Sequence, residues 1–177
     1  VTQFGSLLHL ASRLGNLPIV KLLVNAGADV NLHWEGCGTP VIAACRGGNL
    51  DVVRFLLSNG ASAKRPSGKG LSPLHWMIMF EEDELQPTVR LLLDHSGEIN
   101  VPSMDVVQLR EHSIRFVLNP IHFAVQTRYY KLVEVFLGAG AATRGGNCTP
   151  LDLAVSLGFS ELRSEERRVG KECMESV

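Results

Sequence analysis

The sequence lacks several features that would point to a specific class of function. It contains no apolar stretch close to the roughly 20 residues that a membrane-spanning helix needs. Its net charge is −1, from 17 basic and 18 acidic residues, so total charge gives no support for nucleic acid or an anionic membrane as the main partner. Its four cysteines, Cys37, Cys45, Cys148 and Cys173, show no paired metal-ligand spacing and favour a reduced, intracellular environment.

Catalytic and ligand-binding motifs are also missing. The sequence has no glycine-flanked nucleophilic serine and no zinc-protease helix motif. The acidic run 81–84 lacks the glycine and spacing of a calcium loop, and we expect it to form a solvated turn. The glycines at 36–38 and 68–70 lack the strand and helix that a phosphate loop requires. We therefore expect no catalytic residue, no cofactor and no metal, and the chain is not predicted to be an enzyme.

What the sequence does contain is a repeated six-residue pattern. The first three copies begin at residues 6, 39 and 72, so the period is 33 residues. Two further copies begin at residues 119 and 149. The five copies read SLLHLA, TPVIAA, SPLHWM, NPIHFA and TPLDLA.

The second copy shows why this spacing makes physical sense. Thr39 can accept a hydrogen bond at a helix start, and Pro40 suits the first helical position, where no N–H is needed. Gly48 falls where this helix must stop and suits a left-handed turn. The spacing then predicts a second helix. The predicted core positions of the two helices are Val41, Ala44, Cys45, Val52, Val53, Leu56 and Leu57.

The period and the Thr-Pro-Leu-His-x-Ala core resemble the ankyrin repeat. The resemblance implies an all-α repeat solenoid of helix-turn-helix units joined by β-turn or hairpin fingers. We expect the domain to cover residues 5–162. Its units are expected at about 5–37, 38–70, 71–117 with insertions, 118–147, and an incomplete 148–162. The resemblance also implies that the recurrent His9, His75 and His122 are structural hydrogen-bonding residues rather than metal ligands.

Two units depart from the regular spacing. The third unit carries about three extra residues between its helices, within 80–87, and Glu81 stands at the turn-glycine position. About eleven more residues follow within 101–118. In the fourth unit Arg128 occupies the turn-glycine position, and the finger after it is three residues shorter.

The last fifteen residues break the pattern. The segment 163–173 resembles the translation of a sequencing-library adapter, and we interpret 163–177 as a non-native or disordered tail. The alternative is a genuine, solvated, charged terminal helix. Because neither end carries the polar face of a capping unit, we expect the sequence to be a fragment of a longer array.

The resemblance implies a non-catalytic scaffold or adaptor that binds a partner protein through its finger tips and the concave face of the first helices. We expect a monomer in the cytoplasm or nucleus, without nucleic acid and without membrane insertion. The alternative is a regulatory or substrate-docking segment of a multidomain signalling enzyme, such as a kinase, whose catalytic part lies elsewhere. The partner-binding residues carried over in this way are Trp34, Arg13, Arg46, Trp76, Met79, Phe80, Phe123 and Gln126.

For two groups of these residues, packing within the chain is an alternative to partner binding. The apolar insertion within 101–118 could fold back over Trp76, Met79, Phe80 and Phe123, and we weigh this self-cover equally against partner binding. Trp34 could pack against the neighbouring finger instead of a partner.

Overall fold

The computed structural model describes residues 6–68, 70–109, 112–143 and 149–156, with side chains left out at 104–109, 112–117 and 156. The tail 163–177, Cys148, Cys173 and the second helix of the fifth unit lie outside the described residues.

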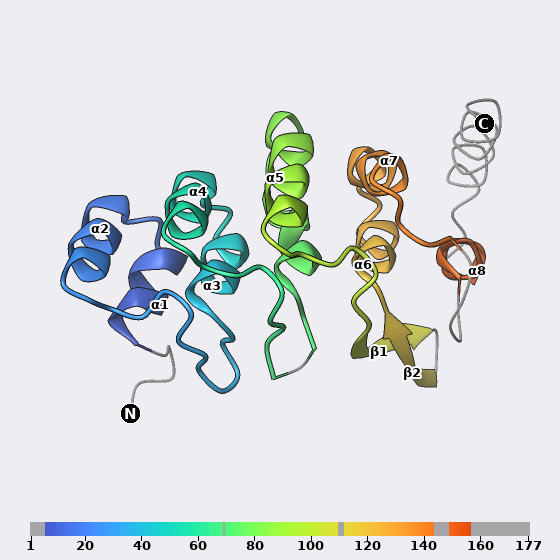
Figure 1. Cartoon of the computed structure of the whole chain (residues 1–177). Coiled ribbons are helices and arrows are strands. Elements are labelled where there is room, and N and C mark those ends of the chain that lie inside the picture. Colours follow the sequence, from blue (N-terminus) through green and yellow to red (C-terminus); the bar gives the residue numbers. More distant parts are fainter. Residues whose placement is uncertain (1–5, 69, 110–111, 144–148, 157–177) are drawn as a thin grey trace.

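The helices stack in two layers, with loops that project to one side as fingers (Figure 1). The inner layer contains α1 (Leu7–Arg13), α3 (Pro40–Arg46), the 3₁₀-helix η1 (Pro73–Met79), α6 (Pro120–Gln126) and α8 (Pro150–Ser156). The outer layer contains α2 (Leu17–Asn25), α4 (Leu50–Ser58), α5 (Glu82–Asp94) and α7 (Tyr130–Gly138). Units one to four are therefore α1–α2, α3–α4, η1–α5 and α6–α7. The predicted all-α repeat solenoid is confirmed.

A continuous apolar core fills the space between the two layers. The core positions predicted for the second unit are all buried, and Gly48 has the expected positive φ of 67°. Val20, Val89 and Val133 occupy in the other units the position of Val53, and all three are buried as well. All four units thus bury a valine at this one position, which is why the period of the sequence specifies the stack.

The predicted cap at Thr39 is wrong. The Thr39 hydroxyl is buried and makes no side-chain capping bond, and it has no hydrogen-bond partner among the described residues. Units one, three and four hold their helix starts with a histidine, whereas unit two has the apolar Ile42 at that position. Without the imidazole, Pro40 and backbone geometry alone begin α3.

The three-residue insertion of unit three lengthens a helix. The predicted solvated turn at 81–84 is wrong, because Glu81 is the N-cap of α5 and Glu82–Glu84 form its first turn. Carboxylates are favourable at a helix N-terminus because they offset the positive end of the helix dipole. Glu81 keeps an extended backbone (φ −69°, ψ 159°), so the left-handed turn of the other units is absent here.

The eleven-residue insertion forms a β-hairpin. Strand β1 (Ser103–Leu109) pairs antiparallel with β2 (His112–Leu118), with Ser103 opposite Leu118 and Leu109 opposite His112. The hairpin backbone continues the row of fingers (Figure 1). Because its inner side chains are not described, self-cover of the apolar residues by this insertion stays a prediction.

Candidate functional site

One row of side chains runs along the inner helices at a single repeat position. Each member lies four residues after the recurrent histidine position, so the stack places all of them on one face. In chain order they are Arg13, Arg46, Met79 and Gln126, and all four are exposed, Met79 at 50 %. We call these residues, with their neighbours Trp76 and Phe123, the inner-helix face.

The structure brings two predicted site residues into direct contact across two units. The guanidinium carbon of Arg46 lies 5.0 Å from the ring centre of Trp76, a cation–π arrangement that joins α3 to η1. Trp76 is half-buried, and its indole N–H has no hydrogen-bond partner among the described residues. Phe123, also half-buried, packs edge-on against His75 at 5.1 Å. The aromatic residues therefore form a platform below the exposed row.

The predicted exposure of Phe80 is wrong, because its side chain is only 3 % exposed. The backbone leaves η1 at Phe80 in an extended conformation (φ −104°, ψ 151°), and the ring joins the core rather than the face. The Phe80 carbonyl accepts a hydrogen bond of 2.9 Å from the Tyr129 hydroxyl. Phe80 is thus a core residue of the junction between units three and four.

Trp34 lies on the first finger and is half-buried. Its backbone N–H donates to the Gly38 carbonyl at 2.8 Å, which closes the finger into a tight loop. The adjacent His33 Nε2 lies 3.3 Å from the Pro66 carbonyl on the next finger. Finger-to-finger contact is thus present beside Trp34, while Trp34 itself keeps an accessible surface.

The recurrent histidines connect units. In unit three the backbone N–H of Ser72 donates to His75 Nδ1 at 3.0 Å, so the imidazole proton is on Nε2. This Nε2–H donates to the Leu118 carbonyl at 3.3 Å, immediately before the next helix cap. His9 makes the equivalent bond to Gly38 at 3.0 Å. His122 Nδ1 accepts from the Asn119 backbone at 3.0 Å, which holds the start of α6 in the same way.

Burial lowers the pKa of His9, and the hydrogen bond to Gly38 opposes this only in part. The neutral imidazole is therefore the form that the fold favours, and it is the form with one donor and one acceptor nitrogen. These contacts account for the histidines structurally. Among the described residues, no group of three His, Cys, Asp or Glu side chains could hold a metal ion.

The residue before two of the outer helices, α4 and α7, makes a second connection between units, which sequence reasoning missed. Asn49 Nδ2 donates to the carbonyls of Ser12 and Arg13, at 3.0 and 2.9 Å. Tyr129 stands at the same repeat position and reaches Phe80 in the same way. Burial and the nearby carboxylates, Glu82 first, raise the pKa of Tyr129 and keep its hydroxyl a donor. The shared position of Asn16, Asn49 and Tyr129 was the available sequence signal.

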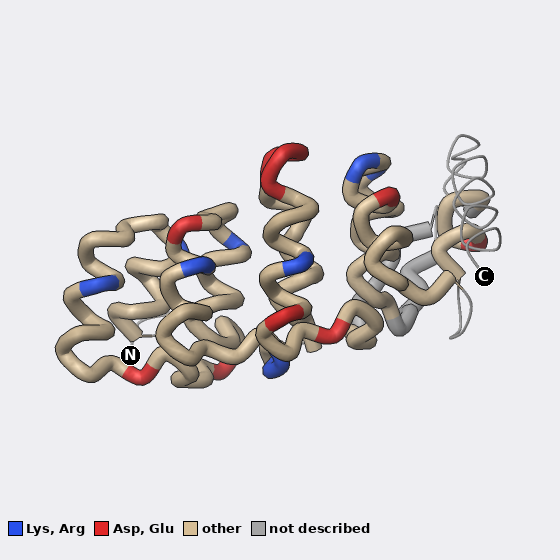
Figure 2. Tube along the Cα trace, turned by 45° about the horizontal axis from the view of Figure 1, so that its top comes forward, with Lys and Arg blue, Asp and Glu red and all other residues tan. Residues whose placement is uncertain are grey.

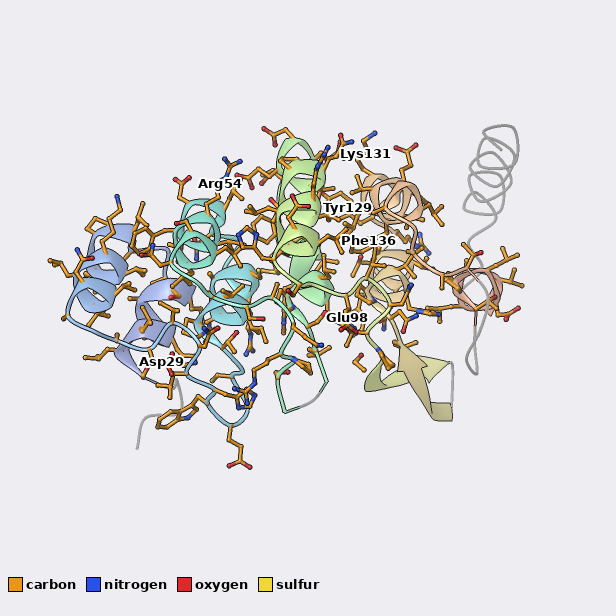
Figure 3. The ribbon with its side chains drawn as sticks, viewed as in Figure 1. Asp29, Arg54, Glu98, Tyr129, Lys131 and Phe136 are labelled. Atoms are coloured by element: carbon orange, nitrogen blue, oxygen red, sulfur yellow. The ribbon has the colours of Figure 1, made fainter. Side chains whose placement is uncertain are left out.

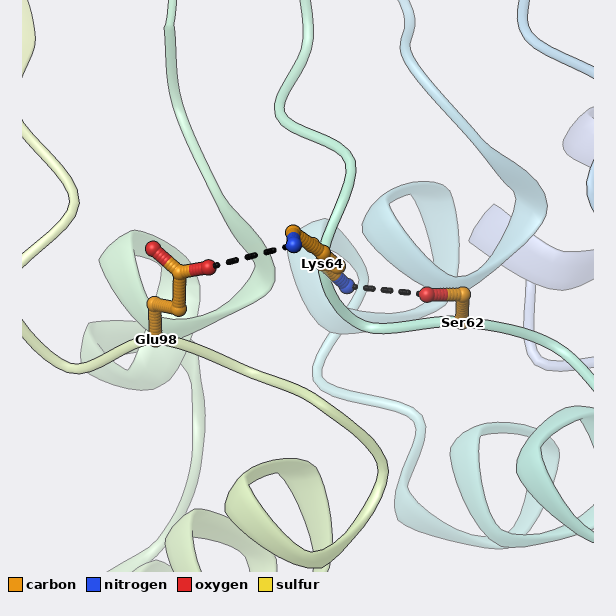
Figure 4. Close-up of polar contacts among 3 residues, drawn as sticks. All are labelled: Ser62, Lys64 and Glu98. Atoms are coloured by element: carbon orange, nitrogen blue, oxygen red, sulfur yellow. Dashed lines mark hydrogen bonds and ion pairs between the residues drawn. The ribbon is translucent and has the colours of Figure 1, made fainter.

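The junction between units two and three lacks both kinds of connection within the described part of the chain, because Ile42 stands at the histidine position and Glu81, the residue before α5, makes no such bond. A backbone bond from Ala63 to His95 (3.1 Å) crosses it instead. The exposed Lys64–Glu98 pair (3.8 Å) crosses it as well (Figure 4). The Arg46–Trp76 contact spans this same junction on the inner-helix face.

Two other features lie away from the face. A groove of about 290 Å³ runs between α5 and α7, and its lining includes Gln86, Val89, Arg90, Leu93 and Val135. No helix in the described part of the chain is both long and apolar enough to cross a bilayer.

Comparison with known proteins assigns the family. Residues 8–105, more than half of the chain, match the family described as "Ankyrin repeats (3 copies)". The chain belongs to the ankyrin-repeat family. The recurrent histidine, the inner and outer helices and the fingers described above are the units of this ankyrin array.

Two of the relatives that this ankyrin-repeat chain matches are much larger proteins. It is 25 % identical over 161 residues to "Ankyrin repeat and KH domain-containing protein mask-1" of Caenorhabditis elegans, covering 90 % of this chain and 6 % of that protein. It is 32 % identical over 91 residues to mouse "Inactive serine/threonine-protein kinase TEX14", covering 51 % and 6 %. It is 42 % identical over 66 residues to human "Protein phosphatase 1 regulatory subunit 27", covering 37 % and 43 %. The chain thus spans less than half the length of each.

Proposed function

We propose that this ankyrin-repeat chain is a non-catalytic scaffold or adaptor that binds a partner protein with its finger tips and its inner-helix face. The observation that carries the proposal is the exposed row of Arg13, Arg46, Met79 and Gln126 above the half-buried Trp76 and Phe123. Arg, Met and aromatic residues are the types enriched in the centres of protein interfaces. Ankyrin repeats are generally interaction modules, which supports the same reading.

The proposed setting is inside the cell, in the cytoplasm or the nucleus, as a monomer that does not need nucleic acid. The described Cys45 supports this setting, because it is a free thiol. Cys45 is fully buried, and burial raises the pKa of its thiol, so it acts as a small core residue.

The small part of its relatives that this chain spans favours a second candidate function. Because this chain spans only 6 % of two of the proteins it matches, it could serve as the regulatory or substrate-docking part of a multidomain signalling enzyme. The inner-helix face would then bind a substrate or a regulator of that enzyme, and the chemistry would belong to another domain.

Site-specific photo-crosslinking tests the proposed face. A photoreactive amino acid is placed at Met79 on the inner-helix face or, as the control, at Arg54 on the outer helix α4 (Figure 3). We expect a partner protein to crosslink from position 79 and not from position 54, and the purified partner to bind the unmodified chain. Crosslinking of the same protein with equal yield from both positions would show that the face is not the binding site.

A further inference from the structure

The geometry points to an extended, acidic segment of the partner as the ligand of the inner-helix face. The segment would carry two carboxylates about three residues apart and an apolar side chain about three residues further along. This inference rests on the proposed function, because it names the chemistry of the partner that the same face would bind.

The first argument is the sign of the charges on the face. Helices α1, α3, η1 and α6 carry only two formally charged residues, Arg13 and Arg46, and both are exposed in the last turn of their helix. The next finger adds the exposed Lys64 and Arg65. A partner with carboxylates opposite these groups is complementary in charge, which gives both orientation and a faster association rate.

The acidic groups of the described chain lie beside the row rather than in it. The longest acidic run, Glu81–Glu84, begins two residues after Met79, at the end of the outer helix α5 that is far from the fingers (Figure 2). Asp152 lies on the inner helix α8, which follows the row in the stack. Glu98 faces Lys64 at 3.8 Å, and Glu35 stands exposed on the first finger. Neither of these two carboxylates lies on an inner helix, so the row itself presents positive and neutral groups only.

The second argument is the arrangement of Arg46. Its guanidinium carbon lies 5.0 Å from the centre of the Trp76 ring, and a guanidinium has five N–H donors, more than one contact with a ring face engages. A guanidinium in this position can bind a carboxylate with two parallel hydrogen bonds. Because the platform already restricts the side chain, less conformational entropy is lost when the carboxylate binds.

The third argument is the spacing of the row. Packed helices lie about 8–10 Å apart, and an extended chain advances about 3.3 Å per residue, so consecutive units correspond to about three ligand residues. Carboxylates opposite Arg13 and Arg46 are therefore about three residues apart. The next step of about three residues reaches Met79, which is half exposed and apolar. This position suits an aliphatic anchor.

Fluorescence anisotropy with synthetic peptides tests the inference. The probe is a labelled peptide with two glutamates three residues apart and a leucine three residues beyond, made in both chain directions with serine spacers. Matched peptides replace the glutamates with glutamine or lysine. The protein variants are Arg13→Gln, Arg46→Gln and Met79→Gln, with Arg54→Gln on α4 as the control for loss of one positive charge, and thermal melts check folding.

We expect the glutamate peptide to bind more tightly than the glutamine and lysine peptides, and more weakly as salt is raised. Arg13→Gln and Arg46→Gln should each weaken it roughly three- to ten-fold, the range between an exposed ion pair and a charge-assisted hydrogen bond. Met79→Gln should weaken binding of the glutamate peptide through loss of the contact with its leucine, and Arg54→Gln should change nothing.

Three outcomes overturn the inference: equal binding of the glutamate and glutamine peptides, absence of binding by the glutamate peptide, or an equal loss in Arg54→Gln. The photo-crosslinking at positions 79 and 54 separates this failure from failure of the proposed function. A partner that crosslinks from position 79, alongside peptides that show no acidic preference, would keep the proposed function and remove only the acidic ligand.

Discussion

Replacing Asn49 with alanine should lower the free energy of unfolding by about 1–3 kcal/mol. The side chain donates two hydrogen bonds to the end of α1, to Ser12 and Arg13, and each such bond contributes about 0.5–1.5 kcal/mol net. The Asn49 side chain makes no capping bond to its own helix α4, so the whole loss belongs to the junction between units one and two.

Asn16 provides the matched control. It occupies the same repeat position, but its side chain accepts only a local bond of 3.2 Å from the Ile19 backbone, on the exposed start of α2. Asn16→Ala should therefore cost about 0.5–1 kcal/mol, the usual value of an exposed N-cap.

Urea denaturation followed by circular dichroism gives the two free energies. Hydrogen exchange adds a spatial readout, because a solenoid unit is stabilised mainly by its neighbours. In Asn49→Ala the amides of α1 and α2 should exchange faster, while those of α6 and α7 stay unchanged. An Asn49→Ala cost no larger than that of Asn16→Ala, or faster exchange spread over all units, would refute the role assigned to Asn49.

Three further predictions concern single residues. Arg128 holds φ at 58° where units one and two have glycine, so Arg128→Gly should stabilise the chain by about 0.5–1 kcal/mol in thermal melts, the strain of a left-handed non-glycine residue less the backbone entropy of glycine. The same gain in Thr127→Gly, at φ −85°, would contradict this reason. Folding lowers the pKa of His9, so its stabilising effect is present above its ordinary pKa of about 6.5 and is lost as the pH falls below that value. The free energy of unfolding should therefore fall from pH 7 to pH 5, and His9→Gln should make this fall smaller. The same fall in the variant as in the unmodified chain would contradict the role of His9. Trp76→Phe removes a buried N–H that has no described partner and keeps a ring under Arg46, so its melting temperature should be unchanged or higher, whereas a large loss would indicate a missing hydrogen bond.

The sequence pattern was sufficient for the parts of the fold that repeat. The spacing of Val52, Val53 and Gly48 predicts a buried stripe and a left-handed turn, and both are present. These features follow from local periodicity and backbone preference, so they can be read without knowing the neighbours. The structural role expected for His9 and His75 also agrees with their bonds to the next unit.

The errors arose where one unit departs from the repeat. Carrying Phe80 onto the face assumed that the third unit leaves its first helix through a glycine-like turn, but Glu81 keeps an extended backbone and Phe80 turns into the core. The acidic run was assigned to a turn because the length of an insertion does not indicate whether it lengthens the turn or the neighbouring helix. In the structure it lengthens α5.

Other features depend on contacts between units and had no local signal. The Arg46–Trp76 stack joins residues 30 positions apart, and the Asn49 bonds join residues 36 and 37 apart. Thr39 has the local sequence of a helix cap but makes no capping bond. Its unit has Ile42 where units one, three and four have the histidine that would bond to it. Contacts between stacked units can be predicted only when the relative placement of the units is known.

The proposed function places a partner protein on the inner-helix face. Amide hydrogen exchange of the chain, free and saturated with the partner captured from position 79, measures where that partner binds. We predict added protection in the last turns of α1, α3 and α6, at Arg13, Arg46 and Gln126, and in the fingers, with none in the outer helices α2, α4 and α7. Protection confined to the outer helices, or to the groove between α5 and α7, would contradict the claim.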